Sequence, residues 1–175
     1  MNKKIKTPSE SASVLTNLVL PGETNMLNNL FGGELLARMD RISSIAAKRH
    51  SESFQVVTAS VNHVSFNTPV PLGSIVKLEA KVTRAFSSSM EIFVDVWIDD
   101  PVEQKLIKSN NGIYTFVAVD ENNKPTLVPQ IQPETEEEKE RYDAALRRKQ
   151  LSLILAGKLN PQEAHELKSL FMEKK

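Results

Sequence analysis

A pair of glycines at the start of a run of helix formers is the first feature of this chain with chemical potential. In "NNLFGGELLARMD", Gly32 and Gly33 directly precede residues that favour a helix. The first N–H groups of a helix lack partners and carry partial positive charge, and glycine lets another molecule approach them closely. The segment Phe31-Gly32-Gly33 therefore predicts either an oxyanion site or a helix packed tightly against a sheet.

A carboxylate follows on the same predicted helix. Asp40 lies seven residues after Gly33, about 10 Å along a helix axis, at the edge of the apolar face. A carboxylate near a buried face is costly unless it is paired or used. The pattern leaves a functional acid and a purely structural one as equal alternatives, the structural acid being either solvated on the polar face or ion-paired with Arg41 or Arg38.

The remaining reactive residue types form no familiar catalytic pattern. The chain has no cysteine, which excludes disulfides and thiolate chemistry. The histidines show no metal-ligand spacing, and His63 is expected to be a hydrogen-bonded structural residue. Ser87, Ser88 and Ser89 suggest a solvated turn, and no phosphate loop of the G-x-x-x-x-G-K type occurs. We expect no metal and no cofactor.

Periodicity predicts the elements that position these residues. Residues 32–49 repeat apolar positions at helical spacing, whereas from about residue 54 onward the period becomes two. Residues 14–20 predict one earlier strand, and four antiparallel strands follow the helix. Phe93 and Trp97 lie on the outward face of one strand, which suggests that a partner subunit covers it. The class is α+β, with a central helix against an antiparallel sheet.

The two ends of the chain differ from this central part. Residues 1–13 are polar, and we expect them to be loosely held. After Pro133, Thr135 and Glu138 form a capping-box pattern before a long helix. Asn160 and Pro161 predict the start of a second helix. We therefore divide the chain into a domain at 14–133 and a helical extension at 134–175.

Charge and hydropathy exclude several kinds of partner. The 175 residues contain 22 Lys and Arg and 22 Asp and Glu, so the net charge is zero. A neutral chain offers no electrostatic attraction to nucleic acid or to an anionic membrane. No apolar run has the length of a membrane span, and the first residues do not look like a secretory signal. We expect a cytoplasmic protein.

Four segments together resemble a known family. The stretches "LPGETNMLNNLFGGELLARMD", "VVTASVNHVSF", "VTRAFSSSMEIFVDVW" and "YTFVAVDENNKPTLVP" resemble the hotdog-fold acyl-CoA thioesterases of the bacterial and cytosolic long-chain type. This resemblance covers about residues 16–133. It implies a helix wrapped by an antiparallel sheet, a double-hotdog dimer, often three dimers in a hexamer, and hydrolysis of fatty acyl-CoA without a metal.

The resemblance also implies roles for particular residues. Asn25 and Asp40 match the family's catalytic pair, which meets across the dimer interface. Gly33, with Gly32, would bring a backbone N–H to the thioester carbonyl, and Asp40 would act as general base or as nucleophile. The turn with Arg84 and Ser87–Ser89 matches the part that meets pantetheine and phosphates. Asn28 stands where the family often has glycine.

The implied fold is also compatible with another enzyme class and with a non-catalytic role. A hydratase or dehydratase acting on acyl thioesters would need a histidine on the helix or its approach loop, and residues 21–49 contain none. A non-catalytic acyl-CoA-binding module would not need the combination of Asn25, Gly32, Gly33 and Asp40. The sequence therefore favours the hydrolase.

Overall fold

The computed structural model describes residues 4–53, 55–100 and 105–172. The chain divides into two compact units, Met1–Gln132 and Pro133–Lys175. Each unit is described by itself.

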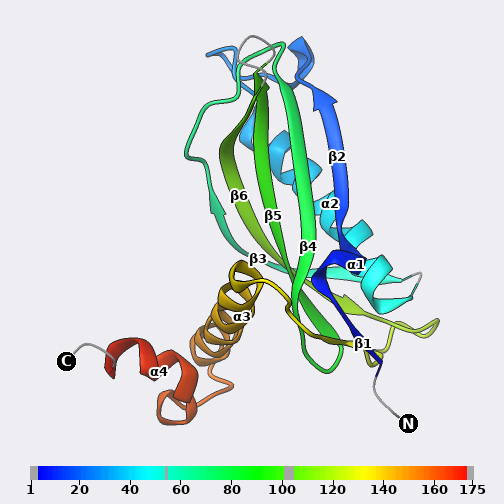
Figure 1. Cartoon of the computed structure of the whole chain (residues 1–175), viewed down its shortest axis with the longest axis vertical. Coiled ribbons are helices and arrows are strands. Elements are labelled where there is room, and N and C mark those ends of the chain that lie inside the picture. Colours follow the sequence, from blue (N-terminus) through cyan, green and yellow to red (C-terminus); the bar gives the residue numbers. More distant parts are fainter. Residues whose placement is uncertain (1–3, 54, 101–104, 173–175) are drawn as a thin grey trace. The chain divides into compact units, whose positions relative to one another are not determined.

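The first unit is built on a five-stranded antiparallel sheet (Figure 1). Its strands are β2 (Ser13–Leu18), β3 (Val56–Ser65), β4 (Ile75–Ala85), β5 (Ser89–Asp100) and β6 (Lys105–Ala118). Their order across the sheet is β2-β4-β5-β6-β3, so β2 and β3 form the two edges. The predicted strand before the helix and the four strands after it are all present.

One long helix, α2 (Gly32–Ser51), packs along one face of this sheet. Its apolar stripe is buried, as helical spacing predicts, and the facing strand residues are buried in alternation. The core contains Leu35, Met39, Ile42 and Ala46 of α2, Val76, Leu78, Ala80 and Val82 of β4, and Met90, Ile92, Val94 and Val96 of β5. A central helix on an antiparallel sheet is the predicted α+β architecture.

A bulge interrupts β4 just before Arg84. Val82 pairs with Ile92, but Arg84 pairs with Glu91, so Thr83 is the extra residue. A bulge shifts the two-residue alternation by one position. Arg84 is therefore half-buried, instead of lying in the core as unbroken alternation would require, while Thr83 is buried and donates a hydrogen bond to Glu91 Oε1 (2.9 Å).

The beginning of the chain is more ordered than its polarity suggests. β1 (Ile5–Lys6) pairs in parallel with β7 (Gln130–Ile131), and a short helix, α1 (Pro8–Ser11), follows β1. Lys6 is buried and donates to the carbonyls of Arg49 and His50 at the end of α2. The expectation of a loosely held start is wrong from Lys4 onward, because contacts with distant residues hold this segment.

Up to residue 172, where its description ends, the second unit contains two helices and a short 3-10 turn. α3 (Glu136–Leu155) begins as predicted, with Thr135 accepting the Glu138 N–H and Glu138 reaching back to the cap. Asn160 caps the 3-10 turn η2 (Pro161–Glu163), whereas α4 (His165–Met172) is separate. The prediction of one continuous helix from Asn160 is wrong, because Ala164 leaves the helical conformation with ψ of 66°.

No helix in the described ranges is both long enough and apolar enough to cross a lipid bilayer.

Candidate functional site

The glycine pair forms an uncapped N-terminus of α2. Phe31 precedes the helix in an extended conformation, and no side chain caps the first turn. The Phe31 ring lies over Gly33, where an added Cβ would come within 2.7 Å of a ring carbon. At Gly32 an added Cβ would make only an ordinary 3.6 Å contact with Phe66. The glycines thus sit beside two rings, each 56% exposed, and not against the body of the sheet.

Asn25 lies at the start of a tight loop just before this helix. Its side-chain oxygen accepts the N–H groups of Leu27 (2.9 Å) and Asn29 (3.3 Å). The backbone N–H of Asn28 bonds to the Asn25 carbonyl, and Asn28 has a positive φ of 55°. Asparagine tolerates this left-handed conformation better than most residues, so the loop can adopt it here without a glycine.

Asp40 is half-buried near the middle of α2. Its Oδ1 accepts a hydrogen bond from the Thr58 hydroxyl of β3 (2.9 Å). Arg38 does not pair with it, because the Arg38 side chain lies 2.8 Å from Glu23. The Tyr114 hydroxyl donates to the Leu36 carbonyl (3.2 Å), and burial, with a further contribution from the Asp40 charge, raises the pKa of Tyr114 to about 12. The phenol is therefore protonated and neutral beside the carboxylate.

Gly33 and Asp40 of one chain do not meet. Both lie within the single helix α2, and seven residues of helix span roughly 10 Å. An oxyanion at the helix start and a base at Asp40 of the same chain are therefore too far apart to act on one carbonyl.

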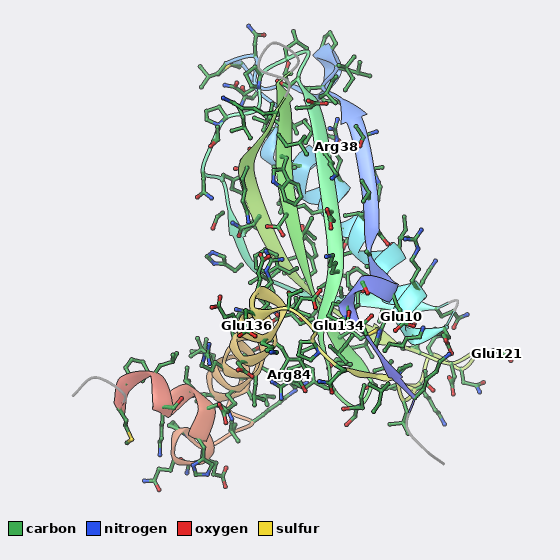
Figure 2. All side chains as sticks on the ribbon, in the orientation of Figure 1. Glu10, Arg38, Arg84, Glu121, Glu134 and Glu136 are labelled. Atoms are coloured by element: carbon green, nitrogen blue, oxygen red, sulfur yellow. The ribbon has the colours of Figure 1, made fainter. Side chains whose placement is uncertain are left out.

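The predicted phosphate-contacting turn lies at the opposite end of the sheet from the Asn25 loop. The loop is anchored to the chain just before β4, where the Leu30 N–H donates to Val70 O (2.7 Å). Arg84 lies ten residues along β4, about 30 Å further at the usual rise per strand residue. Figure 2 shows this separation, with Arg38 near one end of the sheet and Arg84 near the other.

The side chains of this turn are at least partly exposed, but its backbone carbonyls already accept hydrogen bonds. Ser87 is exposed, and Ser88 and Ser89 are half-buried. The three carbonyls accept N–H groups from Val128, Ala118 and Phe86. The Arg84 guanidinium lies 5.8 Å from the centre of the Phe86 ring.

The histidines do not form a metal centre. His50 is fully buried with Nε2 2.8 Å from Pro129 O, and His63 bonds to Ser65 Oγ (2.8 Å) in the predicted structural manner. No cluster of three potential metal ligands occurs within the described residues. A cavity of about 620 Å³ near Glu52 and Asp120 contains none of the predicted site residues.

Two neighbours of Asp40 were not predicted from the sequence. Thr58 and Tyr114 lie on adjacent strands, β3 and β6, which pair with two register shifts. Those shifts occur between Thr58 and Ser60 and between Val61 and His63. Because each bulge reverses which face a side chain occupies, simple alternation along β3 gives no signal that Thr58 faces the helix.

Comparisons of this chain with protein families, curated proteins and solved structures all match thioesterases. Residues 27–105 match the thioesterase superfamily model. An uncharacterized acyl-CoA thioester hydrolase of Bacillus subtilis, YkhA, is 42% identical over 139 residues, covering 79% of this chain and 80% of that protein. A hexameric acyl-CoA thioesterase solved without ligand has a TM-score of 0.83 and 38% identity, covering 87% of this chain and 97% of its own.

A Staphylococcus aureus acyl-CoA hydrolase, solved with butyryl-CoA, CoA and CoA disulfide, is also similar. Its TM-score is 0.81 at 36% identity, covering 94% of this chain and 99% of its own. Variant structures of an acyl-CoA hydrolase from that organism replace an aspartate or an asparagine by alanine, and these two positions are fifteen residues apart. Asn25 and Asp40 have the same spacing. By these matches and by its fold, the chain belongs to the hotdog-fold acyl-CoA thioesterase family.

Proposed function

We propose that this protein hydrolyses the thioester bond of fatty acyl-CoA, releasing a free fatty acid and CoA. The observation that carries the proposal is the pairing of an uncapped, glycine-lined helix start with a half-buried carboxylate on the same helix. Family membership supports the reaction class, and the shared spacing of Asn25 and Asp40 supports the choice of residues.

The chemistry needs a base and an oxyanion site. Asp40 takes a proton from water, and the resulting hydroxide attacks the thioester carbonyl carbon. The carbonyl oxygen becomes an oxyanion, which the Gly33 N–H and the partial positive charge of the helix start stabilise, with Gly32 allowing close approach. Asn25 orients the water or the carbonyl through its side-chain NH2, because its oxygen is engaged by the loop.

The tetrahedral intermediate then collapses. The carbon–sulfur bond breaks, the fatty acid forms, and CoA leaves as a thiolate. The proton taken up by Asp40 passes to this thiolate or to solvent, which restores the carboxylate. Since a thiolate is a good leaving group, no separate general acid is required. The reaction uses water and protein groups, and we propose that it needs no metal or cofactor beyond the CoA of the substrate.

The separation of Gly33 and Asp40 within one chain supports a site shared between subunits. We propose that Asn25, Gly32 and Gly33 of one subunit face Asp40 of another in a double-hotdog dimer. The edge strand β3, which holds Asp40 through Thr58, exposes Val57 (48%) and Val61 (50%). An exposed apolar edge strand is suited to pairing with a second copy. We further propose three such dimers in a hexamer.

The nucleotide part of CoA would be held by Arg84 and the turn at Ser87–Ser89. Because this turn lies about 30 Å along β4 from the Asn25 loop of the same chain, we assign the contact to the turn of a different subunit from the one that supplies the oxyanion site. We assign catalysis to residues 14–133 and treat 134–175 as an extension. Activity in the cytoplasm is part of this proposal, and cell fractionation tests it.

The test is release of thiol from palmitoyl-CoA, followed with a thiol-reactive dye across a series of acyl lengths. We expect one thiol for each substrate consumed. Binding without thiol release would instead indicate a non-catalytic acyl-CoA-binding protein. Loss of the enoyl-thioester absorbance of an enoyl-CoA, again without thiol, would indicate a hydratase.

A further inference from the structure

An ion pair between a buried guanidinium and a carboxylate side chain that is 27% exposed ties α2 to the segment before the Asn25 loop. Arg38 is 3% exposed, and its Nη2 lies 2.8 Å from Oε2 of Glu23 in the 3-10 turn η1 (Pro21–Glu23). Figure 2 labels Arg38 beside the upper part of the sheet. Burying a guanidinium is expensive, and replacing such a pair by apolar side chains often preserves stability. Stability alone therefore explains the pair poorly.

Glu23 is hydrogen-bonded both to the body of α2 and to the residue before the helix. Its side chain accepts the Leu20 N–H (2.8 Å) as well as the Arg38 guanidinium. Its backbone carbonyl accepts the N–H of Phe31 (2.8 Å), the residue before Gly32. One residue is thus fixed both to the helix body and to the first residue before the glycine pair.

The same residue determines where Asn25 lies. Asn25 follows Glu23 by two positions, and Thr24 between them forms an antiparallel bridge with Leu30. The loop is short and internally bonded, since Asn25 N–H donates to the Asn29 carbonyl (2.8 Å). A shift of Glu23 would therefore move Asn25 relative to the N–H groups of Gly32 and Gly33.

We propose that Arg38 is a positioning residue for the hydrolysis, acting through Glu23 to set the separation between Asn25 and the oxyanion site. Arg38 itself touches no substrate, because it is buried between α2 and β2, where Nη2 also approaches the Leu18 carbonyl (3.4 Å). Displacement of a catalytic group by about 1 Å can lower turnover by about 10²-fold. The inference rests on the proposed function, since it concerns the same site.

The decisive experiment separates positioning from stability. Arg38→Met leaves Glu23 without its cation, and Glu23→Gln leaves the guanidinium without an anion, so both single variants should lower the melting temperature. The double variant Glu23→Gln/Arg38→Met removes both charges and keeps an oxygen for the Leu20 N–H. We expect the double variant to regain most of the melting temperature, while kcat stays about 10- to 100-fold low and KM changes less than about 3-fold.

Two further variants complete the test. Arg38→Lys keeps the charge and should restore part of kcat. Lys48→Met replaces a cation by methionine at an exposed position of α2 and should match the wild type. If kcat returns with the melting temperature in the double variant, the pair is structural and the proposal is wrong. A wild type that releases no thiol would overturn the proposed function itself, whereas an active wild type with unaffected Arg38 variants would overturn only this inference.

Discussion

Among the described residues, Asp40 accepts a hydrogen bond from the Thr58 hydroxyl and forms no ion pair, since Arg38 pairs with Glu23. This leaves carboxylate lone pairs for a water molecule. The Thr58 bond fixes the orientation of the carboxylate, as a general base requires. The half-buried position shields it from bulk water without placing it in the core.

We expect Asp40→Asn to lower turnover of acyl-CoA by about 10²-fold or more, because an amide cannot accept the proton from water. The amide oxygen can still accept the Thr58 hydrogen bond, so the melting temperature should change little. Thiol release and thermal unfolding measure the two effects. Near wild-type rates would show that Asp40 is not the base.

Arg84 gives a second prediction about a single residue. Charge-assisted hydrogen bonds to phosphate are among the stronger ones, and the loss of one should raise KM for acyl-CoA by roughly 3- to 30-fold. Arg84→Ala should change kcat much less, and an acyl-pantetheine substrate, which lacks the nucleotide phosphates, should not be affected. Equal KM shifts for both substrates would mean that Arg84 acts through structure, and Lys81 or the basic residues 147–149 would then be tested.

Among the elements, those with a regular pattern could be predicted and those held by distant contacts could not. Apolar residues recur about every 3.6 residues in α2 and every two residues in β4. Both elements are found where expected. The bulge at Thr83 and the bulges of β3 could not be predicted from the sequence, because each depends on pairing with a neighbouring strand. The β1–β7 pair joins Ile5 to Gln130, and no local pattern indicates a partner so far along the chain.

The C-terminal end of α2 gives a prediction about pH. Burial lowers the pKa of His50 below its usual value of 6.5, and the nearby Lys6 charge adds to this effect, while the bond to Pro129 and the charges of Glu10 and Glu52 oppose it. The unfolded chain therefore takes up a proton before the folded chain does. The free energy of unfolding should fall as pH drops through 6.5 toward the lower folded pKa.

Urea unfolding at about pH 7.5 and about pH 5.5 measures this dependence. His50→Gln keeps a side chain that can donate to the Pro129 carbonyl but cannot take up a proton. Its free energy of unfolding should depend less on pH than that of the wild type. Equal slopes for the two proteins would show that His50 does not contribute.

For the whole molecule, the main question is how separate residues form one site. Asn25 and the glycines lie at one end of α2, whereas Asp40 lies about 10 Å further along the same helix. The sequence could place each residue on its element, because local patterns define helix starts and faces. It could not bring them together, because in the proposed shared site that step depends on a second copy. The matching hexameric thioesterase agrees with an assembly of several copies.

A shared site makes a specific prediction about mixtures of inactive subunits. Asn25→Ala and Asp40→Asn should each inactivate the protein. After subunit exchange, a mixed dimer has one site with both substitutions and one with neither. In an isologous dimer with random exchange, about half of the dimers are mixed and half of their sites are intact, so about a quarter of wild-type activity should return.

Native mass spectrometry of isotope-labelled subunits confirms that exchange has occurred, and exchange between two batches of the same variant is the control, which should stay inactive. If exchange is complete and no activity returns, Asn25 and Asp40 work within one chain, and the roughly 10 Å separation along α2 would have to be closed by a conformational change.

If activity returns only above the concentration at which sedimentation shows dimers, the dimer is the smallest active unit. The concentration dependence thus connects catalysis directly to assembly, because a monomer would carry every site residue and still have no complete site.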